Sequence, residues 1–107
     1  MLYMVYGVDK AGDEGRAIRA AAREAHFAYL ERHRGVIVLG GATLADPPDD
    51  ARTGSVLILN VASRAEADAF ANGEPFRKAG LFARYTVTRM RRGQWNPAAA
   101  PKTAERD

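Results

Sequence analysis

The alternation of hydrophobic and polar positions divides the chain into strand-like and helix-like segments. Short runs rich in β-branched and aromatic residues are typical of strands, and apolar residues spaced by three and four are typical of an amphipathic helix. The pattern predicts the order β-α-β-β-α-β. The predicted strands cover residues 2–8, 36–44, 54–61 and 81–92, and the predicted helices cover residues 14–34 and about 64–72.

The ends of the first helix follow from its flanking residues. Asp13 can cap the helix at its N-terminus, and Gly35 is expected to end it. A stripe of apolar residues would pack the helix against the sheet. This stripe is predicted to consist of Ile18, Ala22, Ala25 and Tyr29.

The second half of the chain has clear boundary signals. Ser63 and Glu66 form a capping box at the start of the second helix, and Gly73 ends that helix. Pro75 then opens a further short helical turn. The strand over residues 54–61 is almost entirely apolar, which predicts a central position in the sheet.

The order of elements is the split βαβ pattern of ferredoxin-like folds. We predict an α+β domain with a four-stranded antiparallel sheet and both helices on one face. The domain is expected to span residues 1–95, with residues 96–107 as a flexible C-terminal tail. The other sheet face would expose more apolar surface than a single chain usually leaves in water. We therefore predict a homodimer formed through the sheet faces.

Composition narrows the environment and the partners. The 107 residues include no cysteine, which excludes disulfides and thiolate ligands and is typical of a cytoplasmic protein. The net charge of +3 is dispersed, and no apolar run approaches the roughly 20 residues of a membrane helix. Arginines near Tyr85 leave RNA binding as an alternative, but the third strand lacks the aromatic signature of such modules. We predict a cytoplasmic protein with no nucleic-acid, membrane or cofactor partner.

His26 is the best candidate for an active-site residue. It is one of two histidines, the side chains that exchange protons near neutral pH. On a helical wheel it lies within about 60° of Arg19 and Arg23, beside the apolar stripe. An arginine one turn away can hold a carboxylate in a two-pronged contact. The alternative is a histidine at the core boundary that bonds to the backbone, with solvated arginines.

The other histidine, His33, lies about 10 Å further along the helix axis. That distance is too long for the pair to share a metal ion, so we predict no metal site. His33 instead fits the C-terminal end of the helix, where the helix dipole favours it.

Three further residues are predicted to contact a ligand. Gly41, in the Gly40–Gly41 pair, indicates a bulge or a close backbone approach beside a pocket, although a purely structural role is equally compatible. Ser55 has no neighbouring base, so we expect a hydrogen-bonding residue at the strand start and not a nucleophile. Phe76 completes the substrate-binding set, but it and Trp95 are also typical core or interface residues.

Several short motifs occur in a defined order along the chain. They are Arg23-x-x-His26 with Tyr29–Leu30, Gly40–Gly41, Gly54–Ser55, Glu74–Pro75–Phe76, Ala79–Gly80–Leu81 and Trp95. Together they give residues 1–95 a resemblance to the YciI-like (YCII-related) family of small dimeric α+β barrel proteins.

The resemblance implies a pocket between helices and sheet in which His26 pairs with Glu74 as a catalytic dyad. It also implies a sheet-to-sheet homodimer. The best-known reaction of the family is of the dehydrochlorinase type, and related barrels include muconolactone isomerases. The family commonly has Asp where this chain has Glu74, so the reach of the acid differs. We predict that a Glu74 carboxylate oxygen lies within hydrogen-bond reach of a His26 ring nitrogen, directly or through one water.

Two hypotheses for function remain open. The first is a small enzyme that performs proton-transfer chemistry of lyase, isomerase or dehydrohalogenase type on a small organic acid or aromatic catabolite. In this hypothesis His26 is the general acid/base, Glu74 orients it and Arg23 binds the anion. The second is a non-catalytic dimeric module that binds a small ligand or a protein in the same pocket. A small anionic molecule is the expected ligand.

Overall fold

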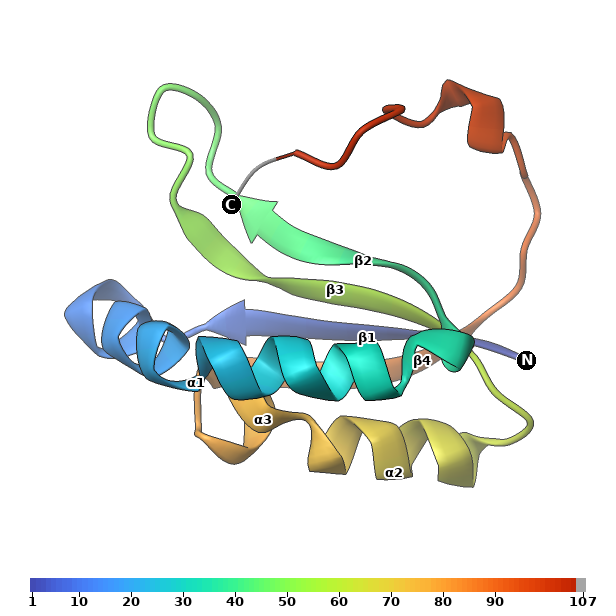
Figure 1. The fold of residues 1–107 in the computed structure, drawn as a ribbon, viewed down its shortest axis with the longest axis horizontal. Helices are drawn as coiled ribbons and strands as arrows, with labels where there is room; N and C mark the ends of the chain where they lie inside the picture. The colour runs from blue at the N-terminus through green and yellow to red at the C-terminus, as the bar shows by residue number, and fades with distance from the viewer. Residues whose placement is uncertain (106–107) are drawn as a thin grey trace.

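The computed structural model describes residues 1–105, and its four strands form one antiparallel sheet. The strands are β1 (Leu2–Asp9), β2 (Ile37–Leu44), β3 (Arg52–Asn60) and β4 (Phe82–Met90). Their order across the sheet is β2-β3-β1-β4 (Figure 1). The apolar β3 therefore lies inside the sheet, which confirms its predicted central position.

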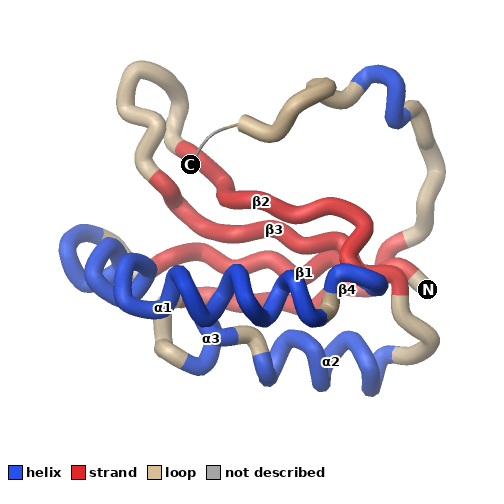
Figure 2. The backbone as a smooth tube through the Cα atoms, in the orientation of Figure 1, coloured by secondary structure: helices blue, strands red, loops and turns tan. Residues whose placement is uncertain are grey.

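The helices cover one face of this sheet (Figure 2). They are α1 (Gly12–Arg32), α2 (Arg64–Gly73) and the four-residue α3 (Pro75–Lys78). The side chain of Ser63 accepts a hydrogen bond from Glu66 N at 3.2 Å, as the predicted capping box requires. The predicted ferredoxin-like α+β fold, the fold class of the dimeric α+β barrels, is confirmed.

The hydrophobic core lies between the helices and the sheet. Along β1 and β3, buried residues alternate with half-buried ones, and the antiparallel register pairs Val5 with Leu57 and Tyr3 with Leu59. These side chains point toward the helices, because they form one cluster with helix residues. The buried cluster consists of Tyr3, Val5, Tyr29, Leu57, Leu59, Val61, Ala67, Phe70 and Ala71.

Both predicted ends of the first helix were wrong. The helix α1 begins at Gly12, so Asp13 lies inside the first turn and does not cap it; its carboxylate forms an ion pair with Arg16. At the other end, the backbone N–H of His33 bonds to the carbonyls of the last turn. The chain then tightens into a 3₁₀ turn over Arg34–Val36, so α1 ends three residues before Gly35.

The predicted apolar stripe of α1 was also wrong at one position. Ala25 is exposed, and the next residue, His26, is buried. Helix α1 packs beside α3 and turns His26 toward it. The buried acid Glu74, at the N-cap of α3, therefore sets the rotation of the helix here, in place of an apolar contact by Ala25.

The C-terminal segment carries one 3₁₀ turn, Pro97–Ala99. The flexibility of the tail over residues 96–107 stays a prediction, and its last two positions, 106–107, lie outside the described residues. Across residues 1–105, no helix combines the length and the apolar character that a membrane crossing requires.

Candidate active site

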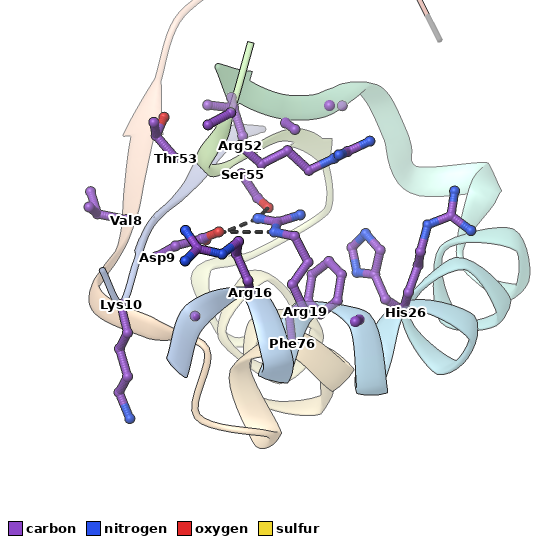
Figure 3. A pocket seen from close by; sticks show the side chains of 18 of the residues that line it. Val8, Asp9, Lys10, Arg16, Arg19, His26, Arg52, Thr53, Ser55 and Phe76 are labelled. Atoms are coloured by element: carbon purple, nitrogen blue, oxygen red, sulfur yellow. Dashed lines mark hydrogen bonds and ion pairs between the residues drawn. The ribbon is translucent and has the colours of Figure 1, made fainter. Parts of the chain in front are cut away.

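A cavity of about 730 Å³ lies between α1 and the part of the sheet formed by β2 and β3 (Figure 3). This volume is in the range typical of small-molecule sites. The lining includes five of the six predicted site residues. They are Arg23, His26, Gly41, Ser55 and Phe76.

His26 and Glu74 form a direct hydrogen bond beneath the cavity. Nδ1 of His26 contacts Oε1 of Glu74, and the two side chains are only 9% and 2% exposed. The predicted contact is therefore present without a bridging water, and the glutamate side chain is long enough to make it. His26 lies deeper than the predicted boundary position, yet it still lines the cavity.

The sequence around Glu74 explains why a carboxylate is stable in this buried position. Glu74 is the N-cap of α3, where Oε1 accepts from Phe76 N and Oε2 accepts from Arg77 N, both at 3.2 Å. Pro75 has no N–H, so these two groups are the first donors that the turn offers. Backbone N–H groups at the helix start thus satisfy both oxygens of this buried carboxylate.

The hydrogen-bonding roles of the two imidazole nitrogens follow from the partner of Nδ1. A carboxylate only accepts hydrogen bonds, so Nδ1 of His26 carries the proton and donates to Oε1. The other nitrogen, Nε2, has no hydrogen-bond partner among the described residues, and it is not sealed from solvent. His26 therefore presents a basic nitrogen to the cavity while its proton-bearing nitrogen is fixed by a buried anion.

Tyr29 helps to hold the two helical segments of the dyad together. Its hydroxyl donates to the Phe70 carbonyl at 2.9 Å, which ties α1 to the end of α2 just before Glu74. A Cβ atom at Gly73 would lie 2.7 Å from the Tyr29 hydroxyl oxygen, so glycine permits this approach. Burial raises the pKa of Tyr29, and the Glu74 carboxylate raises it further.

A second tyrosine lies on the β4 side of the site. The hydroxyl of Tyr85 is buried and is the one such side-chain atom of the described chain that has no hydrogen-bond partner. Burial strongly raises the pKa of Tyr85, and the Glu74 carboxylate acts in the same direction. The ring of Tyr85 packs against Phe82 and beneath the Arg77 guanidinium.

Phe76 separates the dyad from a guanidinium. Its ring stacks on His26 with centroids 3.9 Å apart and an interplanar angle of 15°. The Arg19 guanidinium carbon lies 4.8 Å from the Phe76 centroid, and the three side chains form a row along the cavity floor (Figure 3). Because His26 and Arg19 pack against the faces of the Phe76 ring, the edge of the ring is the part that can contact a ligand.

Arg19 is fixed at the far end of this row. It makes a two-pronged contact with Asp9, with both distances 2.9 Å, and it also donates to the Gly54 carbonyl and to Ser55 Oγ. The side chains of Arg19 and Asp9 are 14% and 8% exposed. Ser55 is therefore a hydrogen-bonding residue of the cavity wall, as predicted, and Arg19 links α1 to the start of β3.

The two adjacent glycines on β2 have different surroundings. A Cβ atom at Gly40 would overlap with Cδ2 of Leu57, whereas a Cβ atom at Gly41 would meet nothing within 4 Å. The close approach that the sequence suggested thus falls at Gly40. Gly41 lines the cavity, and its contact with a ligand stays a prediction.

Some predicted residues lie elsewhere, and some lining residues were missed. Trp95 is 60% exposed and lies outside this cavity. His33 ends α1 and its Nδ1 donates to the Tyr29 carbonyl at 2.8 Å. Asp9 and Arg52 also line the cavity, although the sequence pattern did not predict them there. Both are charged residues at the end of a strand, and this position is the sequence signal that could have identified them. Within residues 1–105, no cluster of three His, Cys, Asp or Glu side chains could hold a metal ion.

Comparisons with known proteins agree with this fold. The model of the YCII-related domain matches residues 1–91, so the chain belongs to the YCII-related family. Protein YciI from Escherichia coli O6:H1 and from Shigella flexneri are each 32% identical over 93 residues, covering 81% of this chain and 93% of the relative.

A solved structure is similar in both sequence and fold. It is 5-chloro-2-hydroxyhydroquinone dehydrochlorinase (TftG) from Burkholderia phenoliruptrix AC1100, in complex with 2,5-dihydroxybenzoquinone. The identity is 38% and the TM-score is 0.77, over 87% of this chain and 96% of TftG.

Proposed function

We propose that this protein is a small enzyme that moves a proton on a small anionic organic molecule, in a reaction of the lyase, isomerase or dehydrohalogenase type. The observation that carries the proposal is the buried His26–Glu74 hydrogen bond, which leaves a basic nitrogen at the cavity. His26 is the general base and acid, Glu74 orients it, and Arg23 at the cavity wall binds the anion. A cytoplasmic location, which the cysteine-free sequence predicts, is part of the proposal.

The proposed reaction starts with a substrate proton near Nε2 of His26. Nε2 takes the proton, and the imidazolium that forms is stabilised by the Glu74 carboxylate at Nδ1. The electron pair of the broken C–H or O–H bond forms a new double bond. In an elimination the leaving anion departs with the electrons of its own bond; in an isomerisation His26 returns the proton to another carbon.

Two observations favour catalysis over binding alone. A module that only binds has no need for a titratable pair with one nitrogen fixed and the other accessible. In addition, the similar protein TftG is named as a dehydrochlorinase. The apolar rings around His26 exclude water from part of the cavity, which strengthens the interaction between the imidazolium and the buried carboxylate.

The proposal includes a homodimer formed through the sheet faces. On β1 and β3 the half-buried residues that alternate with the core, such as Met4, Tyr6 and Ile58, point away from the helices. Exposed Leu39 and Met90 enlarge this apolar surface. Light scattering at micromolar concentration should give twice the 11.6 kDa chain mass, and a clean monomer would refute this assembly.

The catalytic proposal is tested with a panel of chlorinated hydroquinones and aromatic lactones, with chloride release and product formation followed over time. We expect turnover that His26→Asn lowers by about 10²–10⁴-fold, the usual contribution of a general acid/base. His33→Asn, at the C-terminal cap of the same helix and outside the cavity lining, is the matched control and should keep full activity. Turnover that survives His26→Asn, or a panel without any turnover, would contradict the proposal.

A further inference from the structure

The cavity is strongly cationic. Among residues 1–105, five of the lining side chains carry a positive charge, whereas Asp9 supplies the one lining carboxylate. Glu74 lies beneath the cavity and is not part of the lining. The cationic residues are Lys10, Arg16, Arg19, Arg23 and Arg52.

These five cations lie in different parts of the cavity. Arg19 is held by Asp9, the Gly54 carbonyl and Ser55 Oγ, so its charge is matched inside the wall. Lys10 and Arg16 lie at the rim, where they form exposed ion pairs with residues of the first turn of α1. Arg23 and Arg52 also take part in interactions of their own, and they belong to different walls of the cavity.

Arg52 is the first residue of β3, and its side chain extends across the cavity above the row of Arg19, Phe76 and His26 (Figure 3). Arg23 is one turn before His26 on α1, and its guanidinium carbon lies 4.9 Å from the Phe27 ring centroid. The strand wall and the helix wall therefore each supply a guanidinium to the part of the cavity that His26 lines. Guanidinium groups recognise carboxylates through paired parallel hydrogen bonds.

The rest of the lining is suited to the body of the same ligand. Phe27, Leu30 and Leu57 supply apolar surface, and Phe76 adds a ring edge. Planar, unsaturated molecules fit such a surface between aromatic side chains. The cavity of about 730 Å³ has ample room for a single substituted ring.

We infer that the substrate is a hydroxylated aromatic carboxylic acid, and that Arg52 is a specificity-determining residue which binds its carboxylate together with Arg23. This inference rests on the proposed function, because it takes the cavity beside His26 as the substrate site. The carboxylate lies between the two arginines, and the ring places a hydroxyl or ring position at Nε2 of His26.

The test compares two probes that differ in one carboxylate, 2,5-dihydroxybenzoate and hydroquinone, by titration calorimetry. We expect 2,5-dihydroxybenzoate to bind at least about tenfold more tightly, as a charge-assisted two-pronged contact allows. Arg52→Gln should reduce this preference to less than about threefold, and Arg52→Lys should retain part of it because a point charge remains. Arg84→Gln, on β4 and outside the cavity lining, is the matched control and should leave the preference intact.

The inference is overturned if the two probes bind equally, if 2,5-dihydroxybenzoate does not bind, or if Arg52→Gln keeps the full preference while its thermal melting is unchanged. His26→Asn separates this inference from the proposed function. It should lower turnover by about 10²–10⁴-fold but keep the preference for the carboxylate probe. Carboxylate selectivity without any His26-dependent turnover would therefore refute catalysis and leave the recognition by Arg52 standing.

Discussion

The two ends of the cavity floor carry two different ion-pairing groups. At one end His26 donates to Glu74, and at the other Arg19 forms a two-pronged contact with Asp9; Phe76 lies between them. Both pairs are largely buried and both join α1 to another element. An imidazole gains and loses protons near neutral pH, whereas a guanidinium stays charged. The first pair is therefore suited to chemistry, and the second fixes the shape and charge of the wall.

Removing the charge of Glu74 is expected to have the largest effect at the titratable end. Glu74→Gln keeps the size of the side chain but no longer stabilises the imidazolium, so kcat should fall by about 10²–10⁴-fold. Ligand affinity should change little, because Glu74 does not line the cavity. The matched control is Glu66→Gln, which alters an exposed helix-capping glutamate and should leave kcat unchanged. Equal kcat values for wild type and Glu74→Gln would show that the His26–Glu74 pair has no catalytic role and does not differ in this respect from the Arg19–Asp9 pair.

At the other end of the cavity floor, removing the charge of Arg19 should affect the stability of the protein. Arg19→Met leaves the Asp9 carboxylate buried without its partner, which should lower the free energy of unfolding by about 3–5 kcal/mol. Arg16→Met breaks an ion pair whose side chains are 73% and 98% exposed, so its effect should stay below about 1 kcal/mol. Urea unfolding of both variants gives the comparison. Similar losses in the two would show that the Arg19–Asp9 pair has no special structural role.

Substitutions of the two glycines on β2 test how closely the cavity wall is packed between the two ends of the floor. Gly40→Ala forces Leu57 to move, which should destabilise the protein by about 1 kcal/mol and narrow the cavity. Gly41→Ala meets open space and should be neutral. Thermal melts and affinity for 2,5-dihydroxybenzoate provide the readouts. A larger effect at Gly41 than at Gly40 would contradict the assignment of the close approach.

The smallest expected effect concerns Tyr85. Its raised pKa means that above about pH 10 the unfolded chain loses the phenol proton while the folded chain keeps it. The free energy of unfolding should therefore fall as the pH rises beyond that value. Tyr85→Phe removes this loss and an unsatisfied buried hydroxyl, so at neutral pH it should be neutral or stabilising by about 1 kcal/mol. A variant less stable than wild type at every pH would show that the hydroxyl has a structural partner.

Much of the fold could be predicted from the sequence, because strand runs, the Ser63 capping box and the Pro75 turn are local signals. The ends of α1 could not, since backbone hydrogen bonds at His33 and not Gly35 set its C-terminus. His26 and Glu74 were recognised through their motifs. Their approach depends on how α3 packs on α1, which no spacing along the chain encodes. Arg52 was missed for a similar reason, because only the folded sheet brings the start of β3 to the cavity.

The central claim is that His26 donates through Nδ1 to Glu74 and presents Nε2 as a base. It is tested most directly by a long-range proton–nitrogen correlation spectrum of the labelled protein at neutral to mildly alkaline pH. The chain has two histidines, so His33→Asn assigns the signals. We predict that His26 is locked as the tautomer with Nδ1 protonated and Nε2 unprotonated. A His26 ring protonated at Nε2, or one that averages both tautomers as free imidazole does, would contradict the account.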